Sequence, residues 1–114
     1  MKTVKSKQQY LQDCLRIIDH YEADKICLIE ASRKIHNYSM IISSEIIPEF
    51  VCFIGISSQS EHFPLGSVRD KYNKEYLVEL DEEKQRFIKC YKEGADEAIM
   101  ELKTFLEKEL ASIK

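Results

Sequence analysis

The sequence predicts a single all-α domain of four or five helices around one core, with an irregular central loop. Apolar residues recur at spacings of three and four along most of the chain, which is typical of amphipathic helices. The chain has only three glycines and two prolines, so few positions interrupt these patterns. A chain of 114 residues can bury one core but not two, so we expect residues 1–114 to form one domain.

The first part of the chain predicts two helices. From about Val4 to Tyr21, apolar residues form one helical stripe. Asp24 is expected to be the N-cap of the second helix, because its carboxylate can accept hydrogen bonds from the amides of the first turn. The second apolar seam runs from Leu28 to Ile42. The short connection between the two seams predicts an antiparallel hairpin.

The segment that follows fits two secondary structures. Pro48 is well placed as the first residue of a helix, with Glu45 and Glu49 near the positive end of that helix. The run Phe50–Ile56 also suits a buried strand, because it is rich in β-branched and aromatic residues. A lone strand has no partner for its backbone, so we predict a short buried helix here. The alternative is an α+β fold with Phe50–Ile56 as a strand.

A loop is predicted from Ser57 to Gly66, since a proline at position 64 disfavours helix in the residue before it. We expect Glu61, Pro64, Gly66 and Arg69 to form a structural lock for this loop. In that lock the guanidinium of Arg69 binds the carboxylate of Glu61 through two hydrogen bonds.

The C-terminal part of the chain predicts a short helix and a long one. Ser67 is expected to cap the short helix, which continues towards Leu80. Asp81, Glu82 and Glu83 then resemble the start of the last helix, because carboxylates favour the N-terminal end of a helix. The apolar stripe from Ile88 to Phe105 indicates that this helix extends to about Ser112.

Such a helix is longer than a compact domain of this size needs. We therefore expect either that one end projects or that the helix pairs with another chain, as in a homodimer. Gly94 lies beside the apolar stripe and costs about 1 kcal/mol relative to alanine. Its expected compensation is the close approach of another backbone, or a bend in the helix.

The charge distribution excludes some classes of function. The formal net charge is −3, and no basic stripe is visible, so direct binding of nucleic acid is disfavoured. Between Lys34 and Arg69 the chain has no lysine or arginine, only Glu45, Glu49 and Glu61. This central segment is either core sequence with few charged positions or an acidic, partly apolar patch for a basic partner.

Several sequence features indicate a cytoplasmic protein that does not enter the membrane. The N-terminus lacks the apolar region of a secretory signal. The longest apolar run, residues 46–56, is far shorter than the roughly 20 residues that span a bilayer. The four cysteines form no CxxC pair, so we interpret them as reduced thiols.

No catalytic or metal-binding motif is complete. The run from Gly55 to Gln59 resembles the start of G-x-S-x-G, but the second glycine is absent. The three histidines are isolated from one another, without HExxH or paired cysteines. We therefore predict no catalytic residues, no metal and no cofactor. A remaining hypothesis is an enzyme built around Glu61, His62 and Arg69.

One stretch carries a resemblance to other proteins. Residues 53–69, FIGISSQSEHFPLGSVR, resemble a pattern in small uncharacterised bacterial proteins. In that pattern an aromatic and aliphatic run leads into a Ser-Glu-x-x-hydrophobic-Pro-x-Gly-x-x-Arg stretch, which is followed by a long helical tail. The match falls on Ser60, Glu61, Pro64, Gly66 and Arg69, and the pattern names no activity. In size, acidity and lack of catalytic motifs, the chain also looks like immunity proteins of bacterial toxin systems, including those of contact-dependent growth inhibition.

The resemblance to immunity proteins implies a non-enzymatic binding protein that neutralises a cognate toxin, for example a nuclease, by occluding its active site. Acidic groups would pair with the cations that a nuclease uses for phosphate, while aromatic side chains fill the interface. The alternative is a homo-oligomeric helical module that uses its C-terminal helix as the contact. The residues expected to bind the partner are Glu61, His62, Tyr72, Glu79, Asp81 and Glu82.

Overall fold

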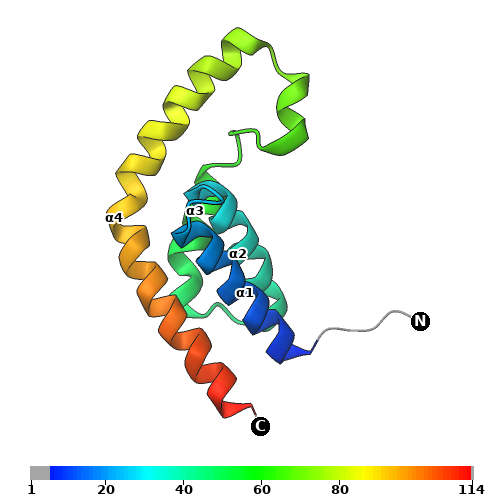
Figure 1. Ribbon diagram of the computed structural model, residues 1–114, viewed down its shortest axis with the longest axis vertical. Coiled ribbons are helices and arrows are strands. Elements are labelled where there is room, and N and C mark those ends of the chain that lie inside the picture. Colours follow the sequence, from blue (N-terminus) through cyan, green and yellow to red (C-terminus); the bar gives the residue numbers. More distant parts are fainter. Residues whose placement is uncertain (1–5, 114) are drawn as a thin grey trace, which may run out of the picture.

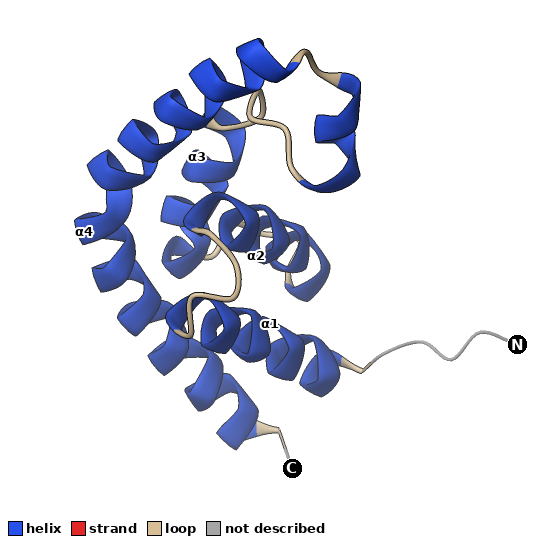
Figure 2. Cartoon of the chain, turned by 45° about the horizontal axis from the view of Figure 1, so that its top comes forward, coloured by secondary structure: helices blue, strands red, loops and turns tan. Residues whose placement is uncertain are grey.

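The computed structural model describes residues 6–113, and those residues form helices without any strand (Figures 1 and 2). The all-α prediction is therefore confirmed, and the run Phe50–Ile56 is helical rather than extended. The elements in chain order are α1 (Lys7–Glu22), α2 (Leu28–Ile42), the short 3₁₀ helix η1 (Pro48–Phe50), α3 (Val51–Gln59), the 3₁₀ helix η2 (Gly66–Lys71) and α4 (Lys74–Ser112).

The first two helices begin with side-chain caps. At α1, the hydroxyl of Ser6 accepts from the Gln9 amide at 3.3 Å, and the Gln9 side chain accepts from the Ser6 amide at 3.0 Å. At α2 the N-cap is Cys27, whose sulfur accepts from the Glu30 amide at 3.5 Å. The prediction of Asp24 as N-cap was wrong. Asp24 has a φ of 59° and lies in the turn between the helices, a conformation that aspartate tolerates better than most residues.

Helix α3 is longer than the sequence predicted. Pro48 begins η1 as expected, and α3 follows directly and ends at Gln59, so the predicted start of the loop at Ser57 was wrong. Two side chains explain the extra turn. Ser57 lies 3.1 Å from the His36 ring on α2, and Gln59 accepts a hydrogen bond from the Tyr91 hydroxyl on α4. These contacts hold the end of α3 against both neighbouring helices.

The start of the last helix was also predicted wrongly. Helix α4 begins at Lys74, after an N-cap at Asn73 whose side-chain oxygen accepts from the amides of Glu75 and Tyr76 at 2.8 and 3.4 Å. The expected cap at Ser67 is absent, because η2 begins at Gly66 with no side-chain cap. The end of α4 at Ser112 is confirmed. With 39 residues α4 is about 58 Å long, and it bows around the other helices (Figure 1).

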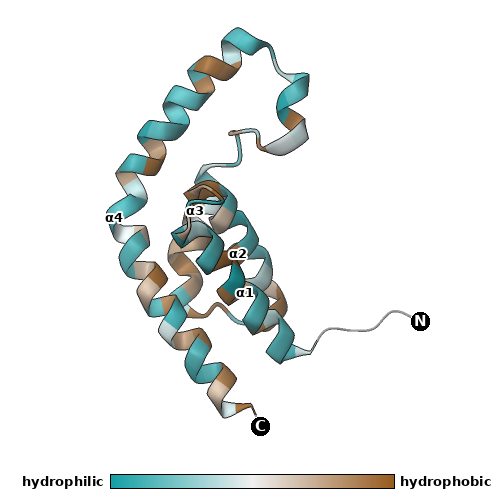
Figure 3. Ribbon diagram, in the orientation of Figure 1, coloured by the Kyte–Doolittle hydropathy of each residue, from teal (hydrophilic) through white to brown (hydrophobic). Residues whose placement is uncertain are grey.

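The core lies between the first three helices and the C-terminal half of α4. Figure 3 shows hydrophobic residues gathered on α3 and interspersed with hydrophilic ones along α4. The apolar stripe of α4 packs within its own chain, since Ala95 and Leu102 are fully buried and the rest of the stripe is partly buried against them. The largest fully buried side chains of this core are Leu11, Ile18, Ile35, Phe50, Phe53, Leu102 and Leu106.

The end of α4 that projects is its N-terminal part. We call η2 and the first turns of α4, residues 66–87, the arm; Figure 1 shows it extending beyond α1, α2 and α3. A small apolar cluster fixes its position, in which Phe63 from the preceding loop packs between Ile29 of α2 and Leu80 of α4. The ring of Phe87 meets that of Phe63 edge to face, with centroids 5.7 Å apart. The arm is therefore anchored to the core rather than detached from it.

Gly94 of α4 allows a stability prediction. No other backbone approaches it, because a Cβ added there meets no atom within 4 Å, so the expected close approach was wrong. We expect Gly94→Ala to raise the free energy of unfolding by about 1 kcal/mol and the melting temperature by about 4 °C, measured by circular dichroism. Gly66→Ala is the matched control. It also has open space but a φ of +63°, so it should lose about 1–2 kcal/mol. Equal effects at the two glycines would contradict this account.

Candidate functional site

Arg33 of α2 holds the loop between α3 and η2, a role that the sequence did not reveal. One of its terminal nitrogens donates to the carbonyl oxygen of Ser60 at 2.5 Å and to that of Phe63 at 2.8 Å. The Ser60 carbonyl lies at the end of α3, where the last carbonyls have no partner within the helix. The guanidinium therefore caps α3 and fixes the backbone of Phe63, whose side chain anchors the arm.

The predicted lock between Arg69 and Glu61 was wrong. Arg69 binds Asp81 instead, through two parallel hydrogen bonds of 2.7 and 2.8 Å that join η2 to α4. The physical reason is the early start of α4, which brings Asp81 opposite η2, whereas Glu61 is exposed on the loop. The middle of the predicted loop is confirmed, since residues 60–65 lie between α3 and η2. Pro64 is buried there, and Gly66, which begins η2, has the positive φ that favours glycine.

The ion pair between Arg69 and Asp81 shifts both groups towards their charged forms. The hydrogen bonds from Arg69 hold the pKa of Asp81 below its usual range, and those same bonds raise the pKa of Arg69. Both side chains remain open to solvent, at 30% and 41% exposure, so water screens the attraction. The pair mainly orients η2 on α4. Asp81, predicted to bind a partner, is therefore engaged within the chain.

The other predicted partner-binding residues are only partly brought together. Glu61 and His62 are exposed on the loop, and the His62 ring lies 4.0 Å from the Glu83 carboxylate of α4. Tyr72 is half-buried and stacks on Tyr76, with ring centroids 6.1 Å apart. The remaining two, Glu79 and Glu82, are exposed on the arm and line the same shallow hollow of about 360 Å³.

We call the surface around this hollow the acidic face. It is formed by one side of α4 and includes an exposed aromatic ring, three carboxylates and one guanidinium. Among the described residues, Glu79 and Glu82 form no ion pair, whereas Glu83 faces His62. Such an arrangement can accept cationic groups beside an aromatic ring. The residues that line the hollow are Tyr76, Glu79, Leu80, Glu82, Glu83 and Arg86.

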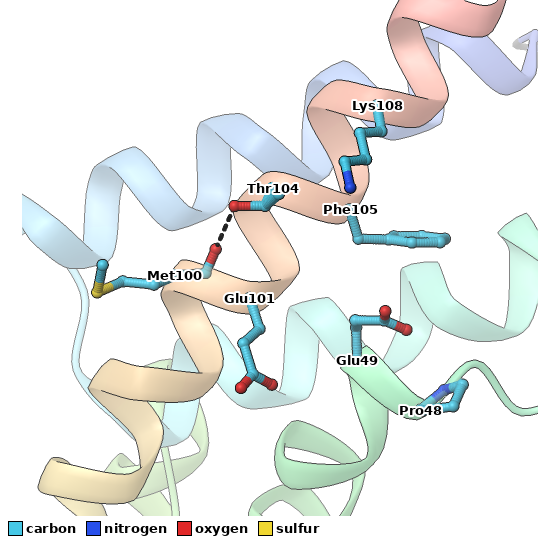
Figure 4. A pocket seen from close by; sticks show the side chains of 7 residues that line it. All are labelled: Pro48, Glu49, Met100, Glu101, Thr104, Phe105 and Lys108. Carbon is cyan, nitrogen blue, oxygen red and sulfur yellow. Dashed lines mark hydrogen bonds between the residues drawn. The ribbon is translucent and has the colours of Figure 1, made fainter.

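A larger hollow, of about 480 Å³, lies between η1 and the C-terminal half of α4. Figure 4 shows the amine of Lys108 and the carboxylate of Glu49 on either side of the ring of Phe105, with the carboxylate of Glu101 farther from that ring. The Thr104 hydroxyl is engaged within its own helix, where it donates to the Met100 carbonyl at 3.0 Å. Lys108 forms no ion pair with either glutamate in the described structure. The hollow offers apolar surface and acceptors for hydrogen bonds.

Ser57 and His36 form a pair that the sequence did not predict, because they come from different helices. The Ser57 hydroxyl lies 3.1 Å from the Nδ1 atom of His36. Nucleophilic catalysis also needs a group that orients the histidine and an accessible serine. Ser57 is buried, and no carboxylate in the described part of the chain bonds to His36. The geometry supports a packing contact between α2 and α3.

The separate hypothesis of an enzyme site at Glu61, His62 and Arg69 lacks support, since Arg69 faces Asp81 instead.

In the part of the chain that the structure describes, the thiols and carboxylates do not gather into a metal site. Burial raises the pKa of Cys14 to about 12, and burial also raises the pKa of Cys52. Within residues 6–113, no group of three or more His, Cys, Asp or Glu is placed to hold a metal ion. None of the helices in that range is both long enough and apolar enough to cross a membrane.

Comparisons with known proteins add no family to this geometry. No family model matches the chain, and neither a similar curated protein nor a similar solved structure was found. Functional inference therefore depends on the arm, the acidic face and the hollow beside η1.

Proposed function

We propose that this protein is a non-enzymatic binding protein that docks a basic protein partner on the acidic face. In its most concrete form, it is an immunity protein that neutralises a cognate bacterial toxin in the cytoplasm. The observation that carries the proposal is the pair of glutamates, Glu79 and Glu82, which form no ion pair within the described chain and lie beside the exposed ring of Tyr76. Carboxylates without an internal partner gain most from the lysines and arginines of another protein.

The anchoring of the arm supports the same proposal. A surface that is already ordered loses less conformational entropy when a partner binds. Here the packing of Phe63 against Leu80 and the ion pair between Arg69 and Asp81 hold the arm from two sides. Tyr76 would supply the aromatic contact that is typical of interface centres.

Occlusion is the mechanism that this surface would use. A nuclease binds phosphate through lysine and arginine side chains, so an acidic surface competes directly for the groups that bind the substrate. The carboxylates of the acidic face would occupy those cations, and the arm would block access to the active site. No catalytic group of this protein is needed for that inhibition.

The test begins with the partner itself. The tagged protein is used to capture the partner from a lysate of its source cells, and the dissociation constant is then measured for purified proteins. We expect the double variant Glu79→Lys/Glu82→Lys to bind at least about tenfold more weakly, because like charges then face each other. The matched control is Glu107→Lys, which changes an exposed glutamate of α4 far from the arm.

Two results would contradict the proposal. Unchanged affinity of the double variant, with an unchanged melting temperature, would exclude the acidic face as the docking surface. A captured partner without toxic activity would exclude the immunity function but leave the binding function in place. A growth assay separates the immunity function from simple binding. The wild-type protein should protect cells that express the toxin, and the double variant should not.

The alternative, a homo-oligomeric helical module, has less support. It depends on the stripe from Ile88 to Phe105 as a seam between chains. That stripe is occupied by the core of its own chain. A dimer through the C-terminal helix would need a different surface of α4.

A further inference from the structure

A second surface of the protein surrounds η1, away from the arm. Two separate hollows lie there. One, of about 330 Å³, lies between the end of α2 and the connection to η1, and Ile47 is among its lining residues. The other is the hollow of about 480 Å³ in Figure 4, whose lining begins at Pro48. The two linings have no residue in common, but Ile47 and Pro48 are consecutive in the chain, so we treat the two hollows together as the η1 surface.

The η1 surface is unusually apolar for an exposed region. The three most exposed large hydrophobic side chains in the described part of the chain are Ile46 at 76%, Met100 at 71% and Met40 at 69%. All three line these two hollows. Scattered exposed hydrophobic residues are normal, but several in the linings of two neighbouring hollows are typical of a site of association. Methionine also adapts its shape to different partners.

The charges around these hollows indicate the kind of partner. Glu45 lines the first hollow, and Glu49 and Glu101 line the second. None of the three forms an ion pair among residues 6–113, and Lys108 is the single lysine or arginine in either lining. A second copy of this chain packed through the same surface would place carboxylates against carboxylates, which is unfavourable. An anionic lipid surface would be repelled for the same reason.

We propose that the η1 surface docks an amphipathic, basic segment of another protein. Apolar side chains of that segment fill the two hollows beside Ile46 and Met100, and its lysines or arginines pair with Glu45, Glu49 and Glu101. The inference goes beyond the proposed function, because the η1 surface and the acidic face lie towards different ends of the molecule (Figure 1). A protein with both surfaces can hold one partner at two places or two partners together.

The probe for this proposal is an amphipathic helical peptide of leucine and lysine, titrated into isotopically labelled protein and followed by NMR. The variant Glu79→Lys/Glu82→Lys is used as the background, so that the acidic face does not compete for the peptide. We expect shifts in the amide resonances of residues around both hollows. A peptide of leucine and glutamate with the same pattern is the control for charge and should not bind.

A pair of matched substitutions tests the apolar part of the site. Ile46→Ser should weaken binding of the leucine and lysine peptide about tenfold, because one buried aliphatic contact is lost. Val78→Ser removes a comparably exposed aliphatic side chain on the arm and should leave the affinity unchanged. Both positions are exposed, so circular dichroism should show the same fold for both variants.

Four outcomes would overturn the proposal. Shifts confined to the arm would place peptide binding there. Equal binding of the leucine and glutamate peptide would show that charge does not select the partner. Concentration-dependent self-association that Ile46→Ser abolishes would identify a second copy as the occupant. Absence of binding to either peptide would leave the η1 surface without a basic partner. None of these results affects the measurement on Glu79 and Glu82, so the two proposals fail independently.

Discussion

Leu102→Ala is expected to lower the free energy of unfolding by about 2–5 kcal/mol, because it removes a fully buried side chain from the centre of the core. Leu102 belongs to the same cluster as Leu11, Ile18 and Phe53, which lie on α1 and α3. Truncation therefore leaves a cavity where α4 meets the other helices. The measurement is urea unfolding followed by circular dichroism, with the free energy extrapolated to water.

The matched control for Leu102 is two residues away on the same helix. Met100 is exposed, so Met100→Ala should change the free energy of unfolding by no more than about 0.5 kcal/mol. The unfolding midpoint of each protein should also be independent of protein concentration, since Leu102 packs within one chain. A midpoint that rises with concentration in the wild type but not in Leu102→Ala would contradict this packing and support the oligomeric seam.

The fold class was predictable from sequence because the apolar seams are regular. Two of these seams lie on helices whose buried sides match the apolar spacing of three and four residues. They run from Leu28 to Ile42 and from Ile88 to Phe105. Phe50–Ile56 was the harder case, since α3 is apolar on nearly every side and lacks a polar face that would mark a helix. The choice of helix over strand was correct, and it depended on the lack of a second strand in the sequence, because an isolated strand leaves its backbone unpaired.

The helix boundaries depended on single capping residues, which the pattern did not reveal. Asn73 is a strong N-cap, but the acidic run from Asp81 to Glu83 resembled a helix start more closely. Those carboxylates lie inside α4, where glutamate has a good helix propensity and is solvated on the outer side. One wrong boundary then changed the predicted site. With α4 beginning at Lys74, Asp81 faces η2 and displaces Glu61 as the partner of Arg69.

The candidate site was predictable only in outline. Glu79 and Glu82 were selected as exposed acids of a helix, and the structure places them together in one hollow. The η1 surface was indicated only by the absence of lysine and arginine between Lys34 and Arg69. The larger of its hollows is lined by Met100 and Glu101 of α4 together with Pro48, residues about 50 positions apart, and no local pattern encodes such an arrangement.

Arg33→Ala is expected to lower the free energy of unfolding by about 2–4 kcal/mol. The substitution removes two hydrogen bonds from a charged donor and leaves the carbonyl oxygens of Ser60 and Phe63 without that partner. Both carbonyls lie in a part-buried region, so water replaces the guanidinium incompletely. The loss should be local as well as global. Hydrogen exchange should accelerate at the end of α3 and in the arm, because Phe63 connects that loop to Leu80.

Two substitutions at and beside this position separate geometry from charge. Arg33→Lys keeps the positive charge but lacks the planar fork that reaches both carbonyls, so it should recover only part of the lost stability. Lys34→Ala removes a neighbouring surface charge that pairs with Glu30 at 3.3 Å, and it should cost less than about 0.5 kcal/mol. If Arg33→Ala costs no more than Lys34→Ala, then the packing of Phe63 alone holds the loop. If it costs more and the arm also exchanges faster, then Arg33 sets the rigidity of the surface on which the acidic face is built.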